Sequence, residues 1–187
     1  LRLAQLLEAE DDQEGALEQY LLALDADPEN VAILSAVADL QRALGDQEAS
    51  ASSYEKLLGL TSGAQKLATA RCLADLQADL DRTHAASASY KIVLELDEDD
   101  LDAVDRIRDL AEKVENWEDF AKYHEQLLEM EGDEDEASAM ALRLAEVLAS
   151  KLKKPTEALE ALVPFARAGD AKCRAEYERL GDSLGRQ

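Results

Sequence analysis

The sequence predicts an all-α fold in which antiparallel helical hairpins stack into a right-handed superhelical solenoid. Three observations predict it. The composition is rich in Ala, Leu and acidic residues, with only 8 Gly, 3 Pro and 4% aromatic residues among 187, and this favours helix. Apolar residues recur at helical spacing along the whole chain. A short motif of one small and one large residue also returns about every 34 residues, which indicates a repeat of hairpin size.

The clearest copy of this motif pairs Ala16 with Tyr20 in the run EGALEQYLLALDADPEN. The same frame returns four times, as Ser50/Tyr54, Ala86/Tyr90, Phe120/His124 and Ala158/Leu162. Two of the four intervals between the large residues match a period of about 34 residues, and the other two are slightly longer. We expect the additions in turns, around 61–63 and at 132–136, because turns bury little backbone.

The periodicity predicts helices at 1–11, 13–27, 31–44, 46–60, 65–80, 83–96, 101–114, 117–130, 135–152, 155–168 and 171–185. Pro155 fits a first helical turn, whereas Pro164 should kink or shorten the same helix. We expect one array over 1–187, because a single hairpin cannot bury its own apolar face. Its repeats are expected at about 1–30, 31–64, 67–100, 101–134 and 139–170, with 171–187 as a capping or next-repeat helix.

These motifs resemble the tetratricopeptide repeat (TPR) family, whose period is about 34 residues. The family's first helix has a large residue followed by Leu and a small residue three and four places on. The second and third repeats fill those places with Leu34, Val37, Ala38 and Ala70, Leu73, Ala74. The turn Gly45-Asp46 and the Leu-Asp-x-Asp-Pro ending at 24–28 also match the family. The family's aromatic residue at the start of each repeat is absent, and the match is looser beyond Asp100.

The resemblance implies a scaffold for protein–protein interaction, in which first helices line a concave groove that binds a partner segment. The family's groove-facing places that we select as candidates are Asp39, Arg42, Arg71, Asp75, Asp79, Asp105, Asp109 and Arg143. The alternative interpretation of these residues is a solvated helix face. Some family members hold a terminal carboxylate of the partner with Lys and Asn at such places. The acidic residues here argue against that mode and favour a basic or amphipathic partner.

The charge balance excludes several classes of partner. The chain carries 42 acidic and 20 basic residues, a net charge of -22, which repels phosphate backbones and anionic membrane surfaces. We therefore expect no nucleic-acid partner and no membrane insertion, and no apolar run approaches the length of a membrane span. The same charge would steer a basic protein toward the chain.

Motifs for catalysis and for cofactors are missing from the sequence, so we expect no enzymatic activity and no cofactor. Neither a nucleophile elbow nor a phosphate-binding glycine loop occurs. The acidic runs at 97–100 and 133–136 lack the ligand order of a calcium loop, and each precedes a helix, where the helix dipole favours carboxylates. His124 occupies the aromatic place of its repeat, which favours packing, and His84 lies at a helix start.

Three further side chains carry expectations of their own. Cys72 should be a small packing residue. Cys173 lies between two basic residues, Lys172 and Arg174, which lower the pKa of a thiol, so a reactive thiol is the alternative to packing there. Trp117 should pack between hairpins.

Two other functions stay open at this stage. The hairpins could serve as a spacer or oligomerisation segment of a large repeat protein, or accompany a catalytic domain that lies outside this chain. The chain begins at Leu1 inside a helical pattern, so we expect it to be part of a longer protein, which would carry any targeting segment. Its composition resembles that of large bacterial repeat proteins, and a cytoplasmic location is favoured.

Overall fold

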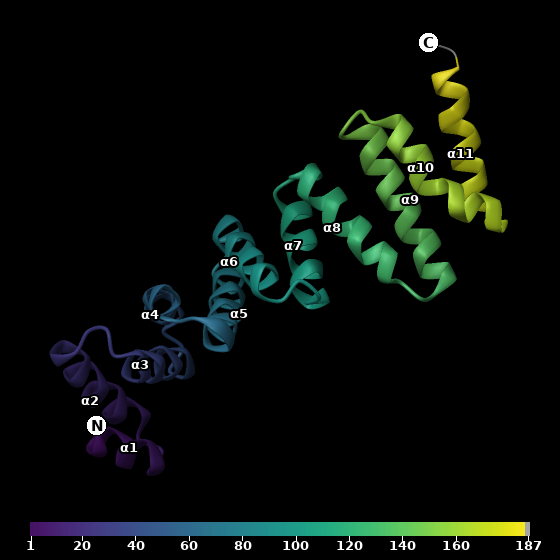
Figure 1. Ribbon diagram of the computed structural model, residues 1–187. Helices are drawn as coiled ribbons and strands as arrows, with labels where there is room; N and C mark the ends of the chain where they lie inside the picture. Colours follow the sequence, from purple (N-terminus) through teal and green to yellow (C-terminus); the bar gives the residue numbers. More distant parts are fainter. Residues whose placement is uncertain (186–187) are drawn as a thin grey trace. The chain divides into compact units, whose positions relative to one another are not determined.

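A computed structural model describes residues 1–185, and within them the regular secondary structure is entirely α-helical (Figure 1). The helices are α1 (Arg2–Ala9), α2 (Gln13–Ala26), α3 (Val31–Ala43), α4 (Gln47–Leu60), α5 (Gly63–Asp79), α6 (Thr83–Leu96), α7 (Leu101–Lys113), α8 (Trp117–Met130), α9 (Glu134–Ser150), α10 (Pro155–Ala168) and α11 (Ala171–Leu184). Every helix coincides with one expected from the sequence, and the ends differ by about two residues at most.

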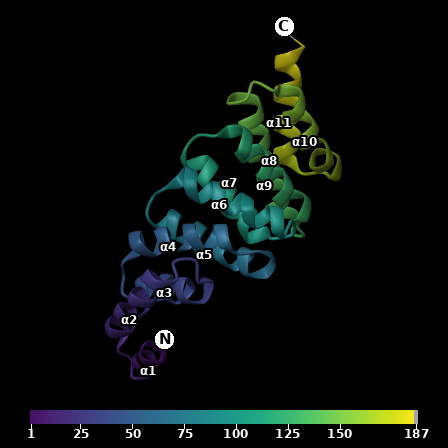
Figure 2. The same cartoon turned by 60° about the vertical axis from the view of Figure 1, so that its left-hand side comes forward.

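The helices form two compact units, Leu1–Asp100 and Leu101–Gln187. In the first unit the hairpins are α1–α2, α3–α4 and α5–α6, and each hairpin's second helix packs on the first helix of the next (Figures 1 and 2). In the second unit the hairpins are α7–α8 and α9–α10. There α8 also packs on α9, and α11 packs on both α9 and α10. The boundary between the units falls where the third expected repeat ends.

The apolar core of each unit runs through the hairpins and continues from one hairpin to the next. In the first unit, Leu34, Tyr54, Leu57 and Leu73 belong to one buried cluster that joins α3, α4 and α5. In the second unit, a corresponding cluster joins α8 to α11. Fully buried alanines allow the helix backbones to approach closely at these contacts, and in the first unit they are Ala4, Ala16, Ala38, Ala51, Ala70, Ala74 and Ala86.

Asp and Asn side chains start six of the helices. Each accepts a hydrogen bond from a backbone N–H of the first turn, which would otherwise have no partner. These N-caps are Asp12, Asn30, Asp46, Asn116, Asp133 and Asp170. The acidic run at 133–136 is therefore the capped start of α9, as the sequence predicts, because Asp133 accepts from the N–H groups of Asp135 and Glu136.

The turn inside each hairpin depends on one residue with positive φ. These residues are Asp11, Gly45, Asp81, Glu115 and Lys153, with φ between 56° and 83°. After Gly45 and after Glu115 the next N–H bonds back across the turn, from Asp46 to the Gln41 carbonyl and from Asn116 to the Ala111 carbonyl. Glycine adopts this conformation without a steric cost, whereas other residues carry a cost of roughly 1–2 kcal/mol.

The expected place of the extra residues and the expected shortening of a helix at Pro164 are both wrong. The extra residues of the longer repeats lengthen first helices instead of turns, since α5 and α9 each have 17 residues where α3 and α7 have 13. Helix α10 is also not shortened at Pro164 but continues to Ala168, while Pro155 occupies its first turn as expected. A proline within a helix removes one backbone hydrogen bond, and packing of the remaining helix offsets that loss.

We predict that Glu115→Gly raises the free energy of unfolding by roughly 0.5–1 kcal/mol, because glycine relieves the steric cost of positive φ. The reciprocal change Gly45→Ala should lower it by a similar amount, although open space surrounds the new methyl group. Urea unfolding followed by circular dichroism measures both. Equal effects of the same sign would contradict this account of the turns.

Candidate functional site

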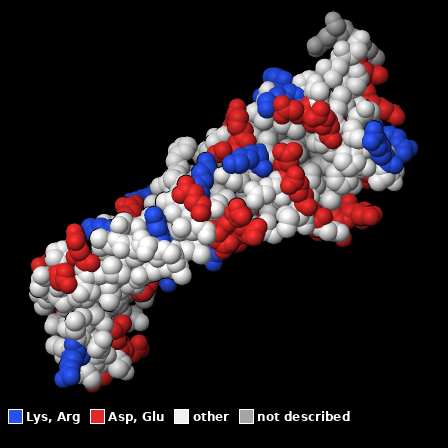
Figure 3. All heavy atoms as spheres, in the orientation of Figure 1, with Lys and Arg blue, Asp and Glu red and all other residues white. Residues whose placement is uncertain are grey.

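Charged side chains lie on the first helices α3, α5, α7 and α9, and in each unit we call the charged side of these helices its first-helix face. In the first unit this face holds Asp39 and Arg42 on α3 and Arg71, Asp75 and Asp79 on α5, all exposed. In the second unit it holds Asp105 and Asp109 on α7 and Arg143 on α9. Spacings of three and four residues put the members of one helix on one side of it. Figure 3 shows acidic and basic side chains scattered over a visible surface that is formed mostly by other residues.

Two carboxylates of the first-helix face hold tyrosines of the following helices. The hydroxyl of Tyr54 donates to Asp39, and that of Tyr90 donates to Asp75 over 2.5 Å. Both tyrosines are only 3% exposed. Each tyrosine hydroxyl approaches the surface only at the point where it contacts its carboxylate. Burial and the nearby carboxylate raise the pKa of Tyr54 far above its ordinary value. Asp39 and Asp75 are therefore exposed residues that also hold a buried tyrosine in place.

The first hairpin repeats this arrangement with a different acid. The Tyr20 hydroxyl donates to Glu8 of α1 over 2.6 Å, and burial together with that carboxylate raises its pKa to about 12. The sequence pattern alone predicts only packing for these tyrosines. The sequence did contain a signal for these bonds, because Asp39 precedes Tyr54 and Asp75 precedes Tyr90 by the same number of residues.

The arginines of the first unit also have intramolecular partners. Arg71 bridges to Asp97 over 3.1 Å and to Asp100 over 2.6 Å, so it neutralises part of the acidic run at 97–100. Arg42 places its guanidinium nitrogen 3.9 Å from the sulfur of Cys72 on α5. These contacts connect neighbouring elements along the first-helix face.

In the second unit the same kind of pairing holds α7 against α9. Arg143 donates to Glu112 over 2.5 Å and to Glu146 over 2.7 Å, and both carboxylates raise its pKa further. Its guanidinium also lies 5.8 Å from the ring centre of Phe120. On α7, Arg108 lies between Asp105 and Asp109, at 2.7 and 2.6 Å.

Most of these ion pairs are exposed, and exposed pairs contribute only about 0–1 kcal/mol each. A charged partner therefore displaces them at little cost. An approaching carboxylate would meet Asp39, Asp75 and Asp79 and be repelled.

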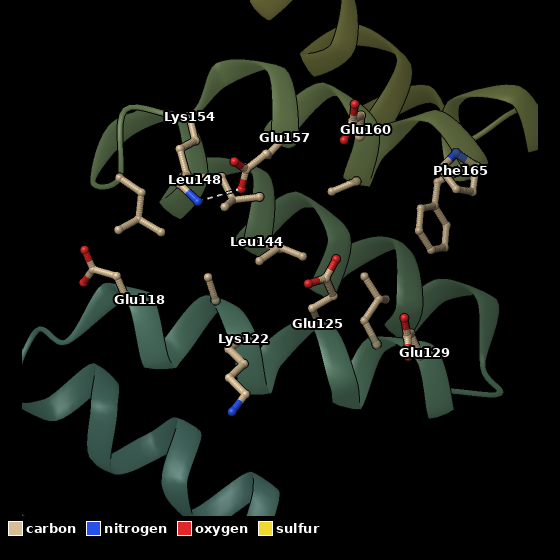
Figure 4. A pocket seen from close by; sticks show the side chains of 15 residues that line it. Glu118, Lys122, Glu125, Glu129, Leu144, Leu148, Lys154, Glu157, Glu160 and Phe165 are labelled. Carbon is tan, nitrogen blue, oxygen red and sulfur yellow. Dashed lines mark hydrogen bonds and ion pairs between the residues drawn. The ribbon is translucent and has the colours of Figure 1, made fainter.

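The second unit contains a cleft that the sequence pattern does not reveal (Figure 4). It has a volume of about 610 Å³ and lies between α8 and α10 above α9. The labelled glutamates Glu118, Glu125 and Glu129 follow one side of it, and Glu157 and Glu160 follow the other. The one sequence feature that points toward this cleft is the recurrence of apolar and acidic residues together at helical spacing on α8.

The histidine and cysteine side chains do not form a reactive site. His124 is buried, stacks on Phe120 at 5.0 Å and lies 3.0 Å from the Met140 carbonyl through Nε2, so it packs as expected. Burial lowers the pKa of His124. Among residues 1–185, no three His, Cys, Asp or Glu side chains gather to hold a metal ion.

The alternative of a reactive Cys173 is wrong. The side chain is buried, and burial together with the neighbouring Asp170 raises the pKa of the thiol to about 11. The effect of adjacent basic residues is outweighed because the thiolate would lie in an apolar cluster beside a carboxylate. Trp117 packs as expected, against Phe120 and a cluster that includes Val147 of α9.

We predict that Asp75→Ala lowers the free energy of unfolding by about 1–2 kcal/mol, because the hydroxyl of buried Tyr90 loses its acceptor. The matched change Asp79→Ala removes a carboxylate from the same helix and should alter it by less than about 0.5 kcal/mol. Urea unfolding measures both. Similar losses for the two variants would show that the tyrosine bond contributes nothing.

A second prediction concerns His124, whose lowered pKa means that folding favours its neutral form. The stability it contributes is complete above the unfolded pKa near 6.5 and is lost as pH falls through the folded pKa. The charged groups that influence His124 are Arg108, Arg143 and Glu112.

Between pH 7.5 and pH 5, wild type should therefore lose more stability than His124→Gln, which cannot titrate. Urea unfolding of both proteins across this range provides the comparison. Both proteins contain the same carboxylates, so the carboxylates' contribution to the pH dependence of stability cancels when the two proteins are compared. An identical pH dependence would contradict the assignment.

Within residues 1–185, the helices lack the length and apolar character needed to cross a bilayer.

No family model matches the chain, and no curated protein matches it. Solved structures do match. MamA is similar at 16% identity and a TM-score of 0.57, over 97% of each chain. YrrB, described as a TPR protein with an unusual peptide-binding site, is similar at 17% identity and a TM-score of 0.56, over 94% of this chain and 88% of its own.

A tetratricopeptide repeat protein from Parabacteroides merdae is similar at 17% identity and a TM-score of 0.57, over 97% of this chain and 71% of its own. At such identities the comparison concerns the fold. The stacked hairpins, the helix order and these matches agree with one another. The chain has the fold of the tetratricopeptide repeat proteins, which confirms the resemblance carried by its sequence repeats.

Proposed function

We propose that this chain is a protein-interaction scaffold and carries out no reaction of its own. A basic or amphipathic segment of a partner protein lies along the first-helix face. The observation that carries this proposal is the set of solvent-accessible carboxylates on the first helices of each unit. In the second unit, Asp105 and Asp109 pair with Arg108 at the surface.

The stacked hairpins support the proposal because, within each unit, they give the face a fixed shape before a partner arrives. Binding to a pre-organised surface avoids the cost of ordering it. The net charge of -22 attracts basic partners over a long range and speeds their encounter at low salt. The shared fold with YrrB adds a precedent for peptide binding on stacked hairpins.

A second candidate function is a structural spacer or an oligomerisation segment. It is favoured by α1, which leaves Leu3 and Leu6 at 54% and 61% exposure, an apolar surface where another hairpin could pack. Light scattering at increasing protein concentration distinguishes this function from the scaffold. A monomer at every concentration argues against self-association, and a rise in mass that Leu6→Glu abolishes supports it.

Affinity capture from a lysate of the source cell tests the scaffold function. The test variant is Asp79→Lys with Asp109→Lys. It leaves Asp39 and Asp75 with their tyrosines and Asp105 with Arg108. The matched control is Asp25→Lys with Glu95→Lys, which makes the same charge change at exposed positions on second helices.

A protein captured by wild type and by the control, but lost with the test variant, is the expected result. Its affinity for the purified chain should fall about tenfold or more in the test variant and decrease with salt. Equal loss with both variants would reject the first-helix face as the binding surface. Absence of any captured protein would favour the spacer.

A further inference from the structure

The cleft between α8 and α10 has a buried apolar base and half-buried apolar side walls. Leu144 and Leu148 of α9 lie at its base, with exposures of 2% and 7%. Leu128, Ala161 and Phe165 line its sides and are only half-buried. The cleft arises because α8 and α10 both pack on α9 and not on one another. It belongs entirely to the second unit, and its walls are second helices, so it is separate from the first-helix face.

The rim of the cleft is acidic. Five glutamates and two lysines surround the floor, and Lys154 is already paired with Glu157 over 3.0 Å (Figure 4). Past Leu128 and Phe165 the cleft adjoins a hollow of about 440 Å³ at the start of α9. That hollow is lined by the acids Glu131, Asp133, Glu134, Asp135 and Asp170. Carboxylates therefore surround the apolar floor along the sides and at one end.

We propose that this cleft binds an amphipathic helix of a partner protein, with an apolar stripe toward Leu128, Ala161 and Phe165 and with Lys or Arg on both flanks. The glutamates of the α8 wall run from Glu118 to Glu129, about three turns or roughly 17 Å of helix. Both walls are themselves helices, and a third helix between them would pack ridges into grooves. Apolar anchors in a groove with charged flanks are the pattern by which amphipathic helices are recognised.

Charge decides which class of occupant fits. A second copy of this chain carries a net charge of -22 and would be repelled by the acidic rim. A nucleic acid or an anionic lipid surface would be repelled in the same way. A basic helix gains both from covering the half-buried apolar walls and from ion pairs between its Lys or Arg and the glutamates.

A labelled synthetic peptide tests this proposal. The peptide has the same length as α8 and a high helix propensity, with Leu at helical spacing and Lys on both flanks. One control peptide replaces Leu with Gln and keeps Lys, and another keeps Leu and replaces Lys with Glu. Binding to the full chain is followed by fluorescence anisotropy at low and physiological salt.

Protein variants then locate the peptide. Glu125→Lys with Glu129→Lys reverses the charge of the rim on α8. Glu14→Lys with Glu18→Lys makes the same charge change at the same spacing, at exposed positions of α2. Ala161→Phe fills the cleft without changing charge. Circular dichroism confirms that each variant is folded before its affinity is measured.

We expect the rim variant to weaken the Lys/Leu peptide about tenfold or more, and the α2 variant less than about twofold. Ala161→Phe should weaken it by a similar factor at both salt concentrations, because the lost contact is apolar. Equal weakening by the two double variants, binding of the Gln peptide as tight as the Leu peptide, or no saturable binding would overturn the proposal. If Asp79→Lys with Asp109→Lys abolished binding instead, the peptide would occupy the first-helix face, which would support the proposed function and refute this cleft.

Discussion

The structure depends on one constraint, which is that no hairpin can bury its own apolar face. The buried clusters consequently continue from one hairpin to the next, since Leu34 and Tyr54 belong to one hairpin and Leu73 to the following one. The same constraint makes each first helix present one side to the core and the opposite side to solvent. The exposed charged stripes are thus a result of stacking, and their spacing is set by the repeat.

Polar contacts reinforce the stack at the places where it meets solvent. The tyrosines that fill the space between helices end at carboxylates of the first-helix face, and Arg143 joins α7 to α9 beside the ring of Phe120. A residue such as Asp39 therefore serves packing and surface charge together. For this reason loss of binding in an Asp39 or Asp75 variant would not by itself identify a binding residue, whereas Asp79 carries no such ambiguity.

The helices could be predicted from sequence because the composition, the helical spacing of apolar residues and the repeat of about 34 residues all indicated the same hairpins. Less could be predicted where one local pattern has two outcomes. Extra residues in a repeat can lie in a turn or lengthen a helix, and the local pattern fits both. In α5 and α9 they lengthen the helix. The partners of Asp39 and Arg71 are distant in sequence and lie on or after other helices, so only the packed structure shows that these groove candidates are already paired. The cleft above α9 depends on the distance between two helices, which no local pattern encodes.

The most direct test of the central claim uses the α3–α4 hairpin alone, as a peptide of residues 31–60. Circular dichroism should show low helicity and no cooperative thermal transition, because its apolar face has lost the neighbours α2 and α5. In the full chain the same residues should melt cooperatively with the rest of their unit. A hairpin that folds cooperatively by itself would contradict the claim that stacking creates both the stability and the surface of this protein.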